Sequence, residues 1–296
     1  MKRWVWIVVG AIVFAGCGGP SVPEGPPLLV LATGEEGGEL SGAIAQFTDE
    51  TGIPVSVEWG TSSNNATRLI EKSGSPVDVL LTDNVVDIWR AAERGALRPI
   101  QSPVLAKVAA QWKDPDNMWA AIDVRPFIVI YPPGEAPGAS YQSLADSALK
   151  GGLCLTSSEL TQNRVLIANL IDDLGVRPAE RVVRGWVRNL GAAPFSHQDD
   201  LLDALRDGRC RYGIASLMSN PEGLLSFVPP NAEYYEIEAI GVGRHAQQTD
   251  RAQQFVSWML EFKTWQAGTG VSTRNVGVAG WRAEEARLLA ERAGYW

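Results

Sequence analysis

The chain of 296 residues is long enough for one large domain or two modest ones, and its fractions of hydrophobic (45%) and charged (20%) residues are ordinary for a globular protein. Its formal net charge of −8 disfavours nucleic acid as a partner, because phosphate binding depends on clustered Lys and Arg. The sequence contains no zinc-type cysteine spacing, P-loop, nucleophile elbow or dinucleotide fingerprint. It therefore gives no support to those metal, nucleotide or hydrolase classes.

The N-terminal residues have the pattern of a lipoprotein signal. A positively charged start is followed by the apolar run Trp4–Ala15, which is shorter than the ~20 residues that a transmembrane helix needs. Small residues precede Cys17, an arrangement that resembles the bacterial lipobox, in which the cysteine thiol receives a lipid. We predict a signal peptide over residues 1–16, and a lipidated Cys17 with a Pro- and Gly-rich tether over 17–27. An ordinary secretory signal or a membrane-anchoring helix is the alternative interpretation.

The segments up to residue 100 alternate between strand and helix. Continuous apolar runs such as 27–33 are typical of strands that are buried on both faces, and Leu40, Ile44 and Phe47 have the spacing of an amphipathic helix. This alternation indicates a mostly parallel sheet that is covered on both faces. We predict strands at 27–33, 53–60, 77–84 and 96–100, and helices at 38–52, 61–74 and 85–95.

The remaining segments repeat this theme. A long extended segment ends in a double proline at residue 133, and strand character returns near residue 232. The pattern as a whole indicates two similar α/β lobes joined by extended segments. We predict strands at 122–133, 211–217 and 232–244, a strand, turn and helix over 153–175, and helices at 139–152, 180–191, 193–208, 249–268 and 281–294.

Cys154 and Cys210 are the candidate disulfide. Both lie in short β-like segments that could neighbour each other in one sheet, and an isolated pair of cysteines in an extracytoplasmic chain favours a bridge. Two separate buried thiols are the alternative.

Five stretches of the sequence are similar, in order and spacing, to the extracellular solute-binding proteins of ABC transporters, and most of all to their ferric-iron-binding branch. They read LLVLATGEEGGELSGAIAQFTDETGIPVSVEWG, SPVDVLLTDNVVDIWRAAERGALRPI, VRPFIVIY, DALRDGRCRYGIAS and AIGVGRHAQQTDRAQQFVSWML. The resemblance implies the type II periplasmic-binding-protein fold, an α/β architecture of two lobes, each a mixed sheet flanked by helices, with a ligand cleft between them. We then expect lobe 1 over 28–123 plus 237–270, and lobe 2 over 124–236 plus 271–296.

The same resemblance implies a function. We expect a monomeric, membrane-anchored receptor outside the cytoplasm, which delivers a small molecule or ion to an ABC permease and its ATPase. No cofactor and no enzyme activity are expected, and the sequence offers no set of nucleophile, base and orienting group. A sensor or accessory lipoprotein without a transport partner is the alternative.

The family's ferric ligands typically include a histidine or other side chain after the first strand, an acid after the third, and two adjacent tyrosines after a strand of the second lobe. By this resemblance the first two positions fall on Glu36 and Asp83, which are the expected metal ligands. The tyrosine position falls on residues 217–219, which are Leu, Met and Ser, so the phenolates are absent. Tyr234-Tyr235 lies in the returning strand instead, where packing is the expected role.

The solute itself is left open by these residues. Ferric ion is a hard cation that favours anionic oxygen donors, and Glu35, Glu39 or a captured anion could complete a site around Glu36 and Asp83. Ferric iron with an anion, a free oxyanion and a small organic acid are the three candidates.

Loops that join strands to helices are the expected solute contacts. Ligands of open α/β sheets bind beyond the carboxyl ends of the strands, and helix N-termini favour carboxylates and phosphates. Helix capping is the alternative role for polar residues at such places. The candidates in these loops are Ser62, Ser63, Asn64, Ser157 and Ser158.

Arg125 lies in the long extended segment, where the family often carries an arginine near its bound anion. It could make a bidentate contact to a carboxylate or phosphate, or a salt bridge within the hinge to Asp123 or another acid.

Four further side chains remain, of which only the two tryptophans have two interpretations each. Trp59 and Trp119 are core residues or stacking surfaces for an organic solute. His197 could line the cleft, whereas His245 is expected on a surface loop.

Overall fold

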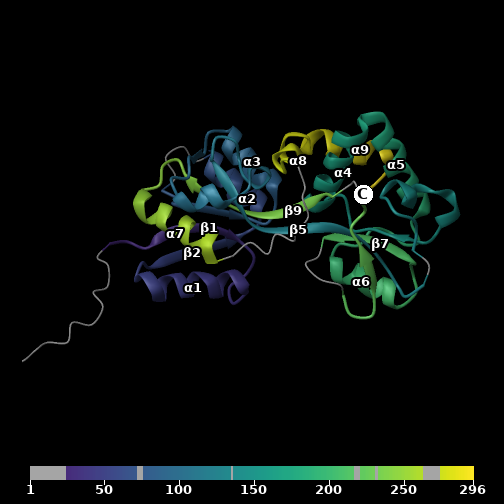
Figure 1. Ribbon diagram of the computed structural model, residues 1–296, viewed down its shortest axis with the longest axis horizontal. Helices are drawn as coiled ribbons and strands as arrows, with labels where there is room; N and C mark the ends of the chain where they lie inside the picture. The colour runs from purple at the N-terminus through teal and green to yellow at the C-terminus, as the bar shows by residue number, and fades with distance from the viewer. Residues whose placement is uncertain (1–24, 72–75, 135, 217–220, 231–232, 263–273) are drawn as a thin grey trace, which may run out of the picture.

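The computed structural model (Figure 1) describes most of the chain, namely residues 25–71, 76–134, 136–216, 221–230, 233–262 and 274–296. Two lobes lie side by side, and two long strands, β5 (Trp119–Tyr131) and β9 (Tyr235–Gly243), run from one lobe into the other. These two strands are the frame on which the rest of the fold is arranged.

The first lobe is built around β1 (Leu28–Thr33). It pairs in parallel with β2 (Val55–Gly60) on one side and with β3 (Val79–Thr82) on the other, which explains its continuous apolar sequence. The first helix ends where Gly52 adopts a φ of 71°, a left-handed conformation that glycine takes without strain. The other elements of this part are α1 (Glu39–Thr51), α2 (Ser62–Glu71), α3 (Val85–Glu93) and β4 (Leu97–Arg98).

The long strands change partners along their length. β5 pairs antiparallel with β9 as far as Pro126, and from Phe127 it pairs with β7 (Tyr212–Ser216) and then β8 (Leu225–Phe227). β9 continues in the other direction and pairs antiparallel with β3 and β4. Both lobes therefore share one sheet, and β5 and β9 form the hinge between them.

The second lobe completes the sheet with β6 (Leu153–Cys154), which is parallel to β7. The strand order is β2-β1-β3-β9-β5-β7-β6. The helices of this lobe are α4 (Thr161–Leu174), α5 (Val176–Asn189), α6 (Gln198–Arg206) and α9 (Ala283–Ala293), while α7 (Thr249–Phe262) packs on the first lobe and α8 (Gly277–Trp281) lies between α3 and α4. The described residues of the two lobes also form four 3-10 helices, namely η1 (Pro103–Lys107), η2 (Ala110–Trp112), η3 (Gln142–Ala145) and η4 (Ser147–Leu149).

The buried side chains form one large cluster that extends through both lobes and a smaller one beneath α6. Two polar side chains inside the large cluster bond to the backbone: the Trp186 indole N–H donates to the Tyr141 carbonyl at 2.8 Å, and the Tyr141 hydroxyl donates to the Phe127 carbonyl at 2.8 Å. The smaller cluster contains a disulfide between Cys154 and Cys210, whose Cα atoms are 5.8 Å apart.

The strands and helices predicted for residues 27–100 are found at their places, and β1, β2 and β3 are parallel as expected. The sheet is no longer parallel where it continues into the hinge strands. β9 runs antiparallel to β3, and β5 runs antiparallel to β9. The reason is geometric, because a chain that crosses from lobe 1 to lobe 2 in one strand and comes back in another must run in opposite directions in the two. The mixed sheet implied by the family resemblance describes the structure better.

Three local predictions also differ from the structure. The helix predicted at 139–152 is replaced by η3 and η4, and the Asp146 side chain caps the second of these by accepting from the Ala148 N–H. The helix predicted at 281–294 is interrupted at Arg282, between α8 and α9, and β8 was not predicted. The end of the helix predicted at 249–268 lies outside the described residues. In the described part of the chain, no helix has both the length and the apolar character needed to cross a bilayer.

Candidate functional site

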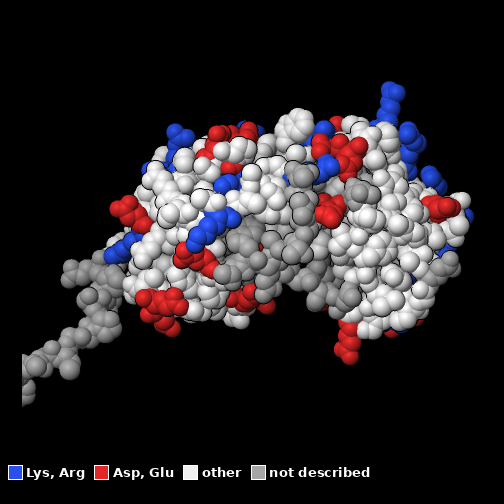
Figure 2. Space-filling view, in the orientation of Figure 1, with Lys and Arg blue, Asp and Glu red and all other residues white. Residues whose placement is uncertain are grey.

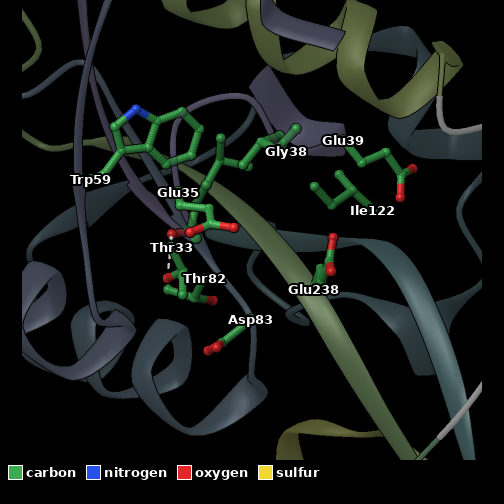
Figure 3. A pocket seen from close by; sticks show the side chains of 12 residues that line it. Thr33, Glu35, Gly38, Glu39, Trp59, Thr82, Asp83, Ile122 and Glu238 are labelled. Carbon is green, nitrogen blue, oxygen red and sulfur yellow. Dashed lines mark hydrogen bonds between the residues drawn. The ribbon is translucent and has the colours of Figure 1, made fainter. Parts of the chain in front are cut away.

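A pocket of about 240 Å³ opens at the carboxyl ends of β1 and β3, beside the hinge strands. Four carboxylates line it: Glu35 after β1, Glu39 in the first turn of α1, Asp83 after β3, and Glu238 in β9. Figure 3 shows that these side chains come from separate elements around one opening, with the Trp59 indole on its wall. Because the carboxylates concentrate negative potential in a small space, the pocket favours a positively charged solute.

Asp83 is held in place by a short chain of hydrogen bonds. The Ser62 hydroxyl donates to Asp83 Oδ1 at 2.6 Å and accepts from the Asp83 backbone N–H at 2.9 Å. The Asn84 amide also donates to Asp83 Oδ1, at 2.8 Å, and Thr33 Oγ1 lies 2.5 Å from the Ser62 hydroxyl oxygen. Ser62 is only 3% exposed, so its role is to orient Asp83 from behind.

Three other predicted contacts lie outside this pocket. Glu36 is exposed and borders a separate depression between α1 and β2. Ser63 and Asn64 are also exposed, and the Ser63 carbonyl accepts from the Arg90 guanidinium at 2.9 Å. The structure therefore brings Ser62 and Asp83 together and leaves Glu36, Ser63 and Asn64 apart from them.

The serine pair of the second lobe has two different environments. The Ser157 hydroxyl accepts from the backbone N–H of Glu159 at 3.1 Å, which closes a local turn before α4. The Ser158 hydroxyl donates to the Tyr295 carbonyl at 2.8 Å, and the residue is only 9% exposed. Ser158 therefore fastens the C-terminal segment to this loop, and Ser157 keeps the more accessible side chain.

Charged residues also gather on one face of the hinge strands. Asp123 pairs with Glu238, and Arg125 with Glu236, in the register of β5 and β9. Arg125 makes ion pairs of 3.7 Å with Asp123 and 3.4 Å with Glu238, so the hinge salt bridge predicted as one of its roles is present. Glu236 is 7% exposed, and its burial raises its pKa to about 7. The nearby charges of Asp83 and Glu238 also raise this pKa, while Arg125 lowers it.

Glu236→Gln is expected to remove a pH dependence of folding stability. The Glu236 carboxyl binds its proton more tightly in the folded protein than in the unfolded chain, so its stabilising contribution is present below about pH 4.5 and is lost as the pH rises through about 7. We expect this group to lower the unfolding free energy of the wild type by about 3 kcal/mol across that window. Urea denaturation of the solute-free proteins at about pH 5 and pH 8 measures the difference. Equal pH slopes in wild type and variant would contradict the assignment.

The adjacent tyrosines Tyr234 and Tyr235 are packing residues. Tyr234 stacks on Tyr141 with ring centroids 5.1 Å apart, and its hydroxyl donates to Asp173 at 2.5 Å. Tyr235 meets Trp112 edge to face at 5.0 Å, and burial raises its pKa to about 12. Residues 217–219, where the family resemblance expects the tyrosine pair, lie outside the described residues.

The two tryptophan candidates differ in burial, and both histidine candidates lie at the surface. Trp59 is half-buried on the pocket wall, whereas Trp119 is fully buried in the core. His197 and His245 are both exposed. Within the described ranges, no three His, Cys, Asp or Glu side chains lie close enough together to hold a metal ion. The pocket acids alone therefore do not enclose an ion.

Glu238 is the pocket carboxylate that the sequence reasoning missed. Its signal was present in the segment YYEIEAIG, where the strand period of two places Glu236 and Glu238 on one face. Two acids on the same face of a strand that is otherwise apolar are unusual unless that face borders a cleft or a charged partner.

Comparison with known proteins identifies the family of this chain. The family model described as "Bacterial extracellular solute-binding protein" matches residues 28–264. The chain is 26% identical to iron uptake protein A1 of Synechocystis sp., in an alignment that covers 86% of this chain and 78% of that protein. It is 31% identical to an Fe(3+)-binding periplasmic protein of Serratia marcescens, with 72% of this chain and 68% of that protein covered.

Solved structures show the same fold. A Trichodesmium protein in complex with iron and citrate ligands matches with a TM-score of 0.80 at 24% identity, covering 90% of this chain and all (100%) of that one. The ferric binding protein from Campylobacter jejuni matches with a TM-score of 0.80 at 20% identity over the same shares of the two chains, 90% and 100%. The two-lobed, type II binding-protein fold expected from the sequence is confirmed. The chain belongs to the bacterial extracellular solute-binding proteins.

Proposed function

We propose that this protein is the solute receptor of an ABC importer and that its solute is ferric iron, bound together with an anion. The pocket lined by Glu35, Glu39, Asp83 and Glu238 is the observation that carries this proposal. Ferric ion is a hard cation that prefers anionic oxygen donors, and its charge relieves the repulsion among these carboxylates. A free oxyanion or organic acid is itself negatively charged, so the pocket carboxylates repel it and their mutual repulsion remains. The relatives named for iron uptake and Fe(3+) binding support the metal as well.

The anion supplies donors that the protein lacks. Among the side chains that the structure describes, no group of three acids, histidines or cysteines is close enough to hold an ion alone. The related Trichodesmium structure contains iron and citrate together, which fits such an arrangement. Arg125 lies on the same face of the hinge strands as Glu238 and offers the anion a cationic partner. Ser157, at the start of α4, is the candidate contact from lobe 2.

Solute capture is proposed to close the two lobes about β5 and β9. We assign lobe 1 to residues 28–123 plus 237–270 and lobe 2 to 124–236 plus 271–296, since β5 exchanges β9 for β7 as its partner at Phe127. A ligand shifts such an equilibrium only by its difference in affinity for the two forms, so a solute that contacts both lobes favours the closed one. The closed receptor is then the form that an ABC permease and its ATPase accept.

Thermal denaturation of the domain without residues 1–17 tests the solute. We expect ferric citrate to raise Tm, because a ligand at 100-fold excess over Kd stabilises the folded state by about 2.7 kcal/mol. Citrate alone and phosphate alone are expected to leave Tm unchanged. Equal stabilisation by citrate alone would identify an organic-acid receptor instead, and no response to ferric citrate would contradict iron as the solute.

We also propose that Cys17 carries a lipid anchor that holds the receptor on a bacterial membrane outside the cytoplasm, in the periplasm or at the cell surface. Cys17 lies outside the described residues, and the sequence pattern is the support. Cys17→Ser is expected to move the protein from the membrane fraction to the soluble fraction, because the attached acyl chains provide the stable anchoring. Fractionation and immunoblotting measure the shift. A variant that stays in the membrane fraction would favour an uncleaved apolar helix.

A further inference from the structure

The short helix α8 connects the two lobes at a place away from the hinge strands. It lies between α3 and α4, and Figure 1 shows it above β5 and β9. On one side, the Asn275 side-chain amide donates to the carbonyls of Ala110 at 3.2 Å and Lys113 at 3.3 Å, which belong to the first lobe. On the other side, Arg282 donates to Asp172 of α4 at 3.2 Å. The segment that contains α8 is therefore fastened to both lobes.

α8 and the acidic pocket lie on opposite faces of the hinge. Trp119 of β5 pairs with Gly241 of β9, and Glu238 precedes Gly241 by three positions in the same strand. Successive side chains of a strand alternate between its faces, so Trp119 and Glu238 point in opposite directions. Gly277, at the start of α8, lies against the Trp119 ring, since a β-carbon on this glycine would be 3.6 Å from it. The pocket is at the front of the hinge, and α8 is at its back.

The contact between α3 and α8 has no room for a side chain at Gly280. A β-carbon at this buried glycine would lie 2.5 Å from Cγ and 2.6 Å from Cβ of Trp89 in α3. Carbon atoms that are not bonded to each other prefer separations of about 3.5–4.0 Å. The Trp89 side chain therefore packs directly on the backbone of α8, and any larger residue at position 280 must push α3 and α8 apart.

We propose that Gly280 tunes the affinity of the solute site from behind the hinge, by setting the spacing of α3 and α4 across α8. A rotation about β5 and β9 that narrows the front cleft has to widen the back. A larger residue at position 280 widens the back, so it favours the closed form before any solute binds. Because the apparent Kd falls as the binding-competent fraction rises, such a variant binds more tightly without a new contact to the solute.

The variants Gly280→Ala and Gly280→Leu form a graded test. Nitroxide labels at Ala45→Cys on α1 and Asp199→Cys on α6 report the separation of the lobes, since both helices lie on the side of the molecule away from α8 (Figure 1). In the processed protein without solute, we expect this distance to shorten from wild type to Gly280→Ala to Gly280→Leu in pulsed electron spin resonance. The apparent Kd for ferric citrate is expected to fall by at least about fivefold in Gly280→Leu.

Gly42→Ala is the matched control. Gly42 is also a helical glycine, but a β-carbon there would meet nothing within 4 Å, so neither the distance nor the Kd should change. Adding Trp89→Leu to Gly280→Ala makes room for the new methyl group, and we expect both readouts to return toward the wild-type values. A merely destabilised fold would not be rescued by the loss of a second packing side chain.

The label distance and the apparent Kd test different claims. The label distance tests the role of α8 alone, whereas the Kd for ferric citrate also rests on the proposed function. A label distance that is unchanged in both Gly280 variants would overturn the role of α8, whatever the solute is. A distance that shortens in a protein that does not bind ferric citrate would support the role of α8 and reject iron as the solute.

Discussion

Asp83→Asn is expected to weaken the binding of ferric citrate by at least about 100-fold. The substitution keeps the shape of the side chain but removes one negative charge and one anionic oxygen donor from the pocket. Groups that only support a metal ligand lower affinity by about 10- to 100-fold when they are replaced, so loss of a ligand should reach at least the upper value. In free energy this is about 2.7 kcal/mol. Competition titration against a chelator of known affinity measures the change.

Two further variants make this result specific to the pocket. Asp116→Asn changes the same charge in an exposed turn that does not line the pocket, and we expect it to leave the affinity unchanged. Glu36→Gln distinguishes the two descriptions of the site, because the family resemblance makes Glu36 a ligand while the structure leaves it on a separate depression. A large loss in Glu36→Gln together with normal binding in Asp83→Asn would show that the pocket described here is not the iron site.

The sequence predicted the parts of the fold that depend on local pattern. The apolar run 28–33 became β1, paired on both sides, and Gly52 ended α1 in the left-handed conformation that its position required. The partner exchange of β5 could not be read in the same way. Residues 119–131 form one uninterrupted strand, and only the arrival of β9 and β7 from distant parts of the chain decides which half pairs with which.

The candidate site was predicted only where a strand end and its hydrogen bonds decide the geometry. Asp83 follows β3 and Ser62 begins α2, and the structure joins them at 2.6 Å. Ser63 and Asn64 do not follow Ser62 into the site, because each successive residue of an α-helix is rotated by about 100° around the axis. Glu238 was missed because its strand reaches the pocket from the far end of the chain.

Reduction of the disulfide between Cys154 and Cys210 is expected to lower the free energy of unfolding by about 4 kcal/mol, because the bridge constrains a loop with a sequence separation of 56 in the unfolded chain. Few other contacts around the bridge could compensate for its loss in the folded state. The bridge lies inside the small cluster beneath α6, where Leu201 and Leu205 are among the few large apolar partners. Urea denaturation with and without reductant measures the loss.

The double variant Cys154→Ala/Cys210→Ala separates stability from binding. Both cysteines are almost fully buried in lobe 2, whereas the pocket carboxylates come from lobe 1 and β9. We therefore expect the variant to lose about as much stability as the reduced protein while the affinity for ferric citrate stays unchanged. In the domain without residues 1–17, unfolded but not reduced, a thiol reagent should detect no free thiol, and two reactive thiols would mean that the bridge is absent. A bridge that was needed for binding would instead make affinity fall with reduction, which would place part of the solute site next to β6.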